Sequence, residues 1–163
     1  MAVELDGFED FAKEMDKLAA ATEDGSRYWT NMAKRVLTEA AQPIEKRAVQ
    51  NADRIADTGT LSESIETFKP VKHKNGGGFT VRVGVRRRRP PGYYVMNIHK
   101  ASEVYGAYYA PEVEFGHGAD PTGARGPAAP HPFLRPAYDA KKEEAYRKIR
   151  DGLELLLFEK RNS

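Results

Sequence analysis

Two stretches of the chain carry apolar residues at every third or fourth position, with polar residues between them. The first stretch covers residues 27–57, and its apolar positions are Trp29, Met32, Val36, Ala40, Ile44, Ala48, Ala52 and Ile55. The second covers residues 135–163, and its apolar positions are Ala137, Tyr138, Ala145, Ile149, Leu153, Leu156 and Leu157. This spacing gathers the apolar side chains on one face, so it predicts two long helices that each bury that face.

Prolines and a glycine modify these two helices. Pro43 lies inside the first helix, where it removes a hydrogen bond and clashes with the preceding turn, so we expect a kink or a break near Ala40. Pro136 suits the first turn of the second helix. Gly152 weakens the second helix by about 1 kcal/mol relative to alanine. A shorter stripe predicts one more helix near the N-terminus, with apolar positions Phe8, Phe11, Met15 and Leu18.

A short helix is expected directly after the first long one. Gly59 can take the left-handed conformation that ends a helix. Thr60 and Glu63 then match the capping box, in which two side chains satisfy the free N–H groups at a helix start. The box predicts a short helix that carries Leu61 and Ile65.

The middle of the chain changes to the period of strands. Residues 79–85 alternate apolar and polar side chains, and the glycine-rich turn at 75–78 makes them the second strand of a hairpin. A further strand is expected over residues 92–99. Residues 102–116 fit either a helix or an aromatic-rich strand. The next stretch, 116–132, is so rich in glycine and proline that we predict a long irregular loop.

Length and composition narrow the class of protein. A chain of 163 residues predicts one domain with a core of its own. The sequence contains no cysteine, which excludes disulfides, a thiol nucleophile and thiolate metal sites. We expect no signal peptide, because the acidic N-terminus lacks a basic start followed by an apolar run. We also expect no membrane span, because no apolar run of the sequence is long enough to cross a bilayer.

The charge is distributed unevenly along the chain. Residues 67–102 contain nine lysines and arginines and no acidic residue, whereas the rest of the chain carries 17 basic and 24 acidic residues, a net charge of −7. One basic segment in an acidic chain indicates a polarised molecule that meets a negatively charged partner on one side.

The densest part of this basic segment is the run of four arginines from Arg86 to Arg89, followed by two prolines. Two interpretations stay open: a solvated loop that keeps a sheet edge from pairing, or a finger that meets phosphate groups or an acidic protein. Neighbouring tyrosines allow a base-stacking platform or an ordinary half-buried sheet: Tyr93, Tyr94, Tyr105, Tyr108 and Tyr109. No recognised DNA- or RNA-binding motif accompanies the run, so we expect no base-specific recognition.

One group of residues resembles an acid–base or metal site: Glu112, Glu114, His117 and His131. Carboxylates at positions i and i+2 point to opposite sides of a strand or a helix, so both cannot face one ligand without a special turn. The two histidines lie at opposite ends of the loop, and no zinc-binding spacing is present. The glycines of the loop also lack the Lys-Ser/Thr of a phosphate-binding loop. Solvated or capping roles therefore fit these residues better than catalysis.

Three short motifs, in a fixed order, resemble those of the tail-component family of long-tailed, lambda-like bacteriophages, the head–tail joining or tail-completion proteins. The first motif consists of Thr58, Gly59, Leu61, Ser64 and Ile65. The second consists of Tyr109, Ala110, Glu114, Phe115 and Gly116. The third consists of Pro132, Phe133, Leu134, Arg135, Pro136 and Ala137. The chain departs from the family by a longer segment between the hairpin and the second motif, and by His117 where threonine is usual.

The resemblance implies an α+β fold, in which a small antiparallel β-sheet packs against a long N-terminal helix and a C-terminal helix. It implies one tail-component domain over residues 1–163, with an extended basic hairpin at about 69–100 and a Gly/Pro loop at 116–132. It further implies a structural joint formed by Gly59, Glu114, Phe115, Gly116, Phe133, Leu134 and Arg135. In this joint, Phe115, Phe133 and Leu134 anchor the two ends of the loop in the core, and Arg135 pairs with Glu114.

The function that the resemblance implies is structural, with no catalytic activity, cofactor or metal. Copies of the chain, expected to number six, form a ring at the neck of the virion, between the tail tube and the head connector or stopper. The arginines Arg86, Arg87, Arg88 and Arg89 then meet either the packaged DNA or an acidic neighbour. We expect the protein in the virion and, during assembly, in the host cytoplasm. The alternatives are a stand-alone nucleic-acid-binding module that uses the same arginines, and a hydrolase that uses Glu112, Glu114 and His117.

Overall fold

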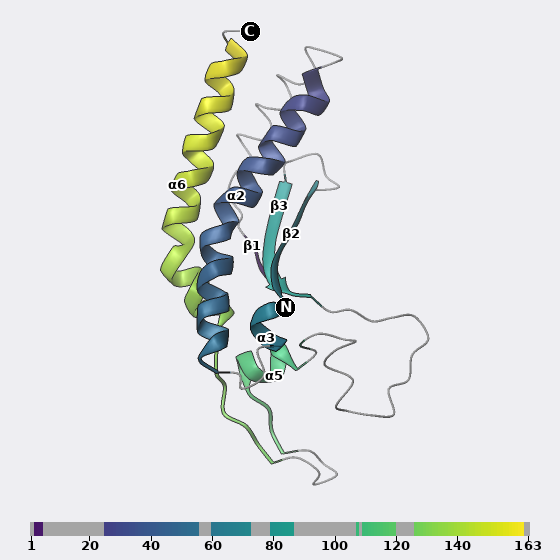
Figure 1. The fold of residues 1–163 in the computed structure, drawn as a ribbon, viewed down its shortest axis with the longest axis vertical. Coiled ribbons are helices and arrows are strands. Elements are labelled where there is room, and N and C mark those ends of the chain that lie inside the picture. Colours follow the sequence, from purple (N-terminus) through teal and green to yellow (C-terminus); the bar gives the residue numbers. More distant parts are fainter. Residues whose placement is uncertain are drawn as a thin grey trace, which may run out of the picture. The chain divides into compact units, whose positions relative to one another are not determined.

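A computed structural model describes residues 2–4, 25–55, 60–72, 79–86, 107, 109–119 and 126–161. In chain order its elements are β1 (Ala2–Glu4), α2 (Gly25–Asp53), α3 (Thr60–Glu63), β2 (Ile65–Lys72), β3 (Phe79–Val85), α5 (Ala110–Phe115) and α6 (Leu134–Arg161) (Figure 1). A long N-terminal helix, an antiparallel sheet and a C-terminal helix confirm the predicted α+β class. None of the described helices combines the length and the apolar character that a membrane span requires.

The chain gathers into two compact units. The first unit comprises Met1–Val3, Glu45–Glu66 and Gly84–Ala140, and the second comprises Glu4–Ile44, Thr67–Val83 and Lys141–Ser163. The long helices therefore contribute to both: the last turns of α2 and the first turns of α6 belong to the first unit. The expected N-terminal helix with Phe8, the strand at 92–99 and Gly59 lie outside the described residues.

Helix α2 runs without a break through Pro43, so of the kink or break expected near Ala40, the break is wrong. Ala40 and Ala41 are fully buried and Ile44 is almost so, and such packing supplies most of the stability of a helix in a protein. The buried face in the first half of α2 also differs by one position from the predicted stripe. Ala33 and Leu37 are buried there, whereas Met32 and Val36 are half-buried.

The short helix after Gly59 is confirmed as α3, and its Leu61 is fully buried. Ile65, expected in the same helix, instead begins strand β2. The change follows from local contacts: the Ser64 hydroxyl donates a hydrogen bond to the Thr60 carbonyl oxygen at 2.7 Å, which closes the turn. A β-branched residue placed after that turn favours the strand.

The sheet has the strand order β1-β3-β2, with β3 in the centre. Strand β3 confirms the predicted strand, and its Val81, Val83 and Val85 are buried. The predicted half-buried pattern is wrong, because Thr80 and Gly84 are buried as well and only Arg82 is exposed, as suits a strand with a neighbour on each side. The sequence did not predict β1, because so short a strand shows no period. Strand β2 lies at an edge, where Pro70 lacks an N–H and Lys69 is exposed, both of which discourage pairing with a further strand.

The last two helices settle the ambiguous segment and the C-terminus. Residues 110–115 form the helix α5, with a proline in its first turn. Helix α6 confirms the predicted C-terminal helix. Five positions of its predicted stripe are buried: Ala137, Ala145, Ile149, Leu153 and Leu156. Tyr138 and Leu157 are half-buried.

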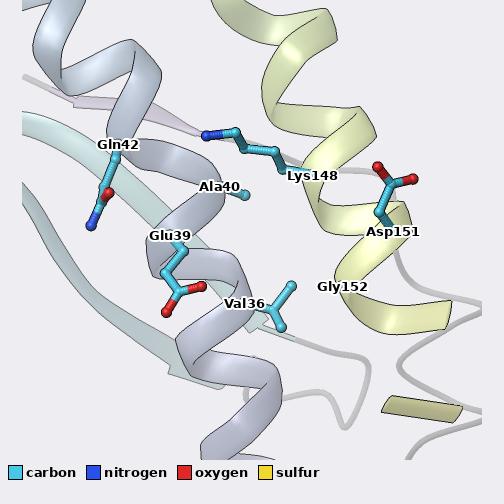
Figure 2. Close-up of a pocket in the computed structure, with 7 residues that line it drawn as sticks. All are labelled: Val36, Glu39, Ala40, Gln42, Lys148, Asp151 and Gly152. Carbon is cyan, nitrogen blue, oxygen red and sulfur yellow. The ribbon is translucent and has the colours of Figure 1, made fainter. Parts of the chain in front are cut away.

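Gly152 has a packing role that the sequence did not reveal. In the second unit α2 and α6 lie side by side, and Val36 points from α2 toward Gly152 (Figure 2). A Cβ atom added at Gly152 would lie 2.6 Å from Val36 Cγ1. The missing side chain of Gly152 therefore lets the two helices approach closely.

Gly152→Ala is expected to lower the free energy of unfolding. Overpacking costs typically about 1–3 kcal/mol, and the better helix propensity of alanine offsets about 1 kcal/mol of that. Urea denaturation of the purified chain measures the net loss. Val36→Ala removes the atoms that clash. Adding Gly152→Ala to Val36→Ala should therefore not cost the stability that Gly152→Ala costs in the parent. A Gly152→Ala protein more stable than the parent would show that the helices are not in close contact there.

Candidate functional site

Glu114 is the one residue of the predicted acid–base group that is buried, with 4% of its surface exposed. Its Oε2 accepts hydrogen bonds from the backbone N–H groups of Phe133 at 2.7 Å and Leu134 at 3.0 Å. Its Oε1 accepts one from the N–H of Arg135 at 3.0 Å. These N–H groups lie at the start of α6, where no helical carbonyl is available to them. The carboxylate on α5 therefore caps the next helix of the chain, on the far side of the Gly/Pro loop.

The last turns of α2 reach the same point of the first unit. The Asn51 side chain donates a hydrogen bond from Nδ2 to the Phe133 carbonyl oxygen at 3.1 Å. Phe133 is fully buried and Leu134 is 1% exposed, so both sit in the core as expected. Side chains from α2 and α5 thus hold the first residues of α6 from both their N–H and their carbonyl sides.

Backbone hydrogen bonds also close the base of the Gly/Pro loop. The N–H of His117 donates to the Ala128 carbonyl at 3.1 Å, and the N–H of Ala128 donates to the His117 carbonyl at 2.9 Å, forming an antiparallel bridge. The N–H of His131 donates to the Val113 carbonyl at 2.7 Å. The two ends of the loop therefore run together before α6 begins.

Gly116 makes this closure possible. Its φ of 70° and ψ of 176° lie in a region that essentially only glycine occupies. A Cβ atom at this position would lie 2.6 Å from the Ala128 carbonyl oxygen. Both the backbone conformation and the close approach of Ala128 and Pro130 therefore require the missing side chain.

Gly116→Ala is expected to cost about 2 kcal/mol or more of stability, because a strained conformation alone costs about 1–3 kcal/mol and the clash is with backbone. Thermal unfolding measured beside Gly118→Ala provides the comparison, since a Cβ atom at Gly118 meets nothing within 4 Å. Equal melting temperatures for the two variants would contradict the conformation assigned to Gly116.

Two expectations about the joint are wrong. The guanidinium of Arg135 does not pair with Glu114; what joins the two residues is the hydrogen bond from the Arg135 backbone N–H to Glu114 Oε1. Its guanidinium carbon lies instead 5.8 Å from the centre of the Phe115 ring. Phe115 does not anchor the loop in the core, since 57% of its surface is exposed. On α5 the buried position is Glu114 rather than the next residue, Phe115.

The other members of the acid–base group are not buried with Glu114: Glu112 and His131 are exposed, and His117 is half-buried. Glu112 is exposed while Glu114 is buried, which is the opposite placement that their spacing predicts. The His117 Nδ1 lies 2.9 Å from the carbonyl oxygen of its neighbour Gly118. Among the residues that the structure describes, no three histidines or carboxylates are grouped to hold a metal ion.

Of the four consecutive arginines, the structure describes Arg86, and it is engaged in an ion pair. Its Nε donates to Glu66 Oε1 at 2.8 Å, and a second guanidinium nitrogen contacts Glu66 Oε2, so the pair has two contacts. The hydrogen bond and the charge of Glu66 raise the pKa of Arg86. Arg87, Arg88 and Arg89 lie outside the described residues.

A groove of about 490 Å³ lies between α2 and α6 in the second unit (Figure 2). It is lined by Val36, Glu39, Ala40, Gln42, Lys148, Asp151 and Gly152. Glu39 already accepts a hydrogen bond from Arg35 at 2.8 Å, and Lys148 lies 3.9 Å from Glu144. The groove reflects small residues at the helix contact, with charged side chains on its rims.

The comparisons with known proteins gave one match. The family model described as "Bacteriophage HK97-gp10, putative tail-component" matches residues 9–116. No curated protein and no solved structure matched the chain. The matched region includes Glu114 and ends at Gly116, so the three N–H groups that Glu114 caps lie beyond it.

Proposed function

Because the chain belongs to the HK97-gp10-like family of bacteriophage tail components, we propose that it completes the tail at the neck of the virion. In this proposal a ring of six copies joins the tail tube to the head connector. The family match over more than half of the chain is the observation that carries the proposal. The same motifs that the match contains, up to Gly116, also resemble those of head–tail joining proteins.

The proposed role is structural and involves no catalysis. Glu114 is the only buried carboxylate of the described residues, and its two oxygens already accept three backbone hydrogen bonds. A carboxylate in this arrangement stabilises a helix start. If the protein were a hydrolase that used Glu112, Glu114 and His117, the double variant Glu112→Ala with His117→Ala would be inactive. A phage that carries this variant would then not grow. We expect normal growth.

The basic segment gives the proposed ring a side that attracts negative charge. Lys69, Lys72 and Arg82 are exposed on the sheet, and residues 67–102 contain no acidic residue. Facing the lumen of a ring, this segment would meet the passing DNA without reading its sequence. Facing outward, it would meet an acidic neighbour in the neck.

The same exposed lysines favour a second candidate function, a stand-alone nucleic-acid-binding module. The two functions differ in what the isolated chain does. A stand-alone module binds a short DNA duplex at low salt, and its affinity falls steeply as salt is added. A neck protein acts in the assembled ring, so we expect the isolated chain to bind such a duplex weakly at any salt concentration.

Deleting the gene from the phage tests the proposed function. Electron microscopy of the lysate should show filled heads separate from tails, or tails of irregular length. Supplying the full-length chain from a plasmid should restore joined particles, which is the control for effects on neighbouring genes. Normal infectious particles in the absence of the protein would contradict the proposal.

A further inference from the structure

Phe115 and Arg135 form an exposed pair on the first unit. Phe115 is 57% exposed, although the preceding Glu114 is buried, which reverses the usual distribution of apolar and charged residues. The guanidinium of Arg135 lies over the Phe115 ring, 5.8 Å from its centre. Exposed aromatic rings with arginines over them are frequent in binding surfaces, where both residue types are enriched.

Helix stability does not explain Arg135. It lies in the first turn of α6, where the helix dipole disfavours a positive charge, and that turn contains no acidic residue. Its guanidinium has no ion-pair partner among the residues that the structure describes. The N–H of Arg135 serves the cap of Glu114, but any residue with a backbone N–H would do the same.

The pair is also held rigidly. Glu114 accepts a hydrogen bond of 3.0 Å from the backbone N–H of Arg135 and so fixes the backbone of that residue. Phe115 directly follows Glu114 in the chain. Gly116 follows in a conformation that only glycine readily takes, and the bridge from His117 closes the loop behind it. Surfaces held in place before binding lose little conformational entropy when a partner arrives.

We propose that Phe115 and Arg135 form the docking surface for another protein of the phage tail, which presents a carboxylate beside an apolar side chain. The proposal rests on the proposed function and names the chemistry of one contact within it. A guanidinium that stacks on a ring keeps its N–H edges available for a carboxylate. The ring supplies apolar area at the same point.

A protein partner fits this surface better than DNA does. A phosphate backbone offers negative charge but no apolar side chain for the ring of Phe115. Glu112, exposed one turn before Phe115 on α5, adds a negative charge that repels a polyanion. A protein partner can place a single carboxylate against Arg135 and keep that negative charge away from Glu112.

The test is to join heads and tails in a lysate of the phage that lacks this gene, by adding the purified full-length chain. The chains compared are the parent, Phe115→Ser, Arg135→Glu and, as a control, Leu155→Ser. Leu155 on α6 is 58% exposed, so it matches Phe115 in residue class and exposure. Melting temperatures of all four should agree within about 2 °C, because neither member of the pair is buried.

We expect Phe115→Ser and Arg135→Glu to reduce the yield of infectious particles at least tenfold, since central interface residues typically change affinity by about that factor or more. The parent and Leu155→Ser should give equal yields, and Arg135→Lys an intermediate one. Full yield from Phe115→Ser and Arg135→Glu, or an equal loss from Leu155→Ser, would overturn the docking surface while leaving the proposed function intact. A parallel loss of binding to a short DNA duplex would assign the surface to nucleic acid and also overturn it. A parent chain that restores no particles would reject the proposed function itself.

Discussion

Phe133→Ala is expected to lower the free energy of unfolding by about 3–5 kcal/mol, the usual cost of removing a buried aromatic ring. The ring is fully buried in the first unit. The backbone of the same residue is held by Glu114 at its N–H and by Asn51 at its carbonyl, so the surroundings cannot easily collapse into the space left by the ring. A large cavity term is therefore expected in addition to the lost apolar burial.

Urea denaturation of Phe133→Ala and Phe115→Ala measures this effect with a matched control. Both changes remove the same ring, but Phe115 is 57% exposed. The control should lose less than about 1 kcal/mol, as exposed substitutions generally do. If Phe133→Ala lost no more than the control, Phe133 would not be an anchor of the core.

Glu114→Ala is expected to cost about 2–4 kcal/mol, because it leaves three N–H groups at the start of α6 without an acceptor. Loss of a single helix cap costs about 0.5–2 kcal/mol, and hydrogen bonds to a charged group are worth about 1.5–3 kcal/mol each. Two of the three N–H groups belong to the buried Phe133 and Leu134, so water does not readily replace the carboxylate.

Two further variants and one local measurement identify the cause. Glu112→Ala removes an exposed carboxylate from the same helix and should leave stability nearly unchanged. Glu114→Gln should fall between, because its amide keeps one acceptor but turns an NH₂ group toward the N–H of Arg135. Amide hydrogen exchange should accelerate at residues 133–135 in Glu114→Ala. Equal stability of the Glu112 and Glu114 variants would contradict the cap.

The regular elements could be predicted because their signals are local. The apolar positions of α6 and the alternation of β3 are visible in sequence windows no longer than the elements themselves. The Thr60 and Glu63 pattern that predicted the short helix is likewise contained within α3. Two features of the long helices depend on contacts outside such windows. Packing around Pro43 keeps α2 continuous. Gly152 weakens α6 by itself, but the closeness of Val36 leaves no room for a side chain at this position.

The candidate site shows the same difference between local signals, which the sequence reveals, and distant contacts, which it does not. The family resemblance implied a joint that includes Glu114, Phe133 and Arg135, with an ion pair between Glu114 and Arg135. In the structure the backbone N–H groups of Phe133 and Arg135 donate to Glu114 instead. The periodicity of a helix as short as α5 does not determine which of its side chains is buried. Glu114 points inward to the N–H groups, and Phe115, the next residue, is exposed. No pattern within the sequence signals a cap that reaches across a whole loop to the start of the next helix.

The cap connects the part of the chain that the family model matches with a part that it does not match. The matched region ends at Gly116, whereas Glu114 holds residues 133–135, which start the last helix. The joint therefore attaches the unmatched C-terminal helix to the matched part of the chain. It leaves Phe115 and Arg135 on the surface beside the closed base of the loop.

The position of the protein in the virion tests the central claim most directly. Cryo-electron microscopy of purified virions, with the chain carrying a compact C-terminal tag, would locate it by the additional density. The proposed function predicts a ring of this density between the head connector and the tail tube. Density along the tail tube or at the distal tip of the tail, or virions that contain none of the protein, would contradict it.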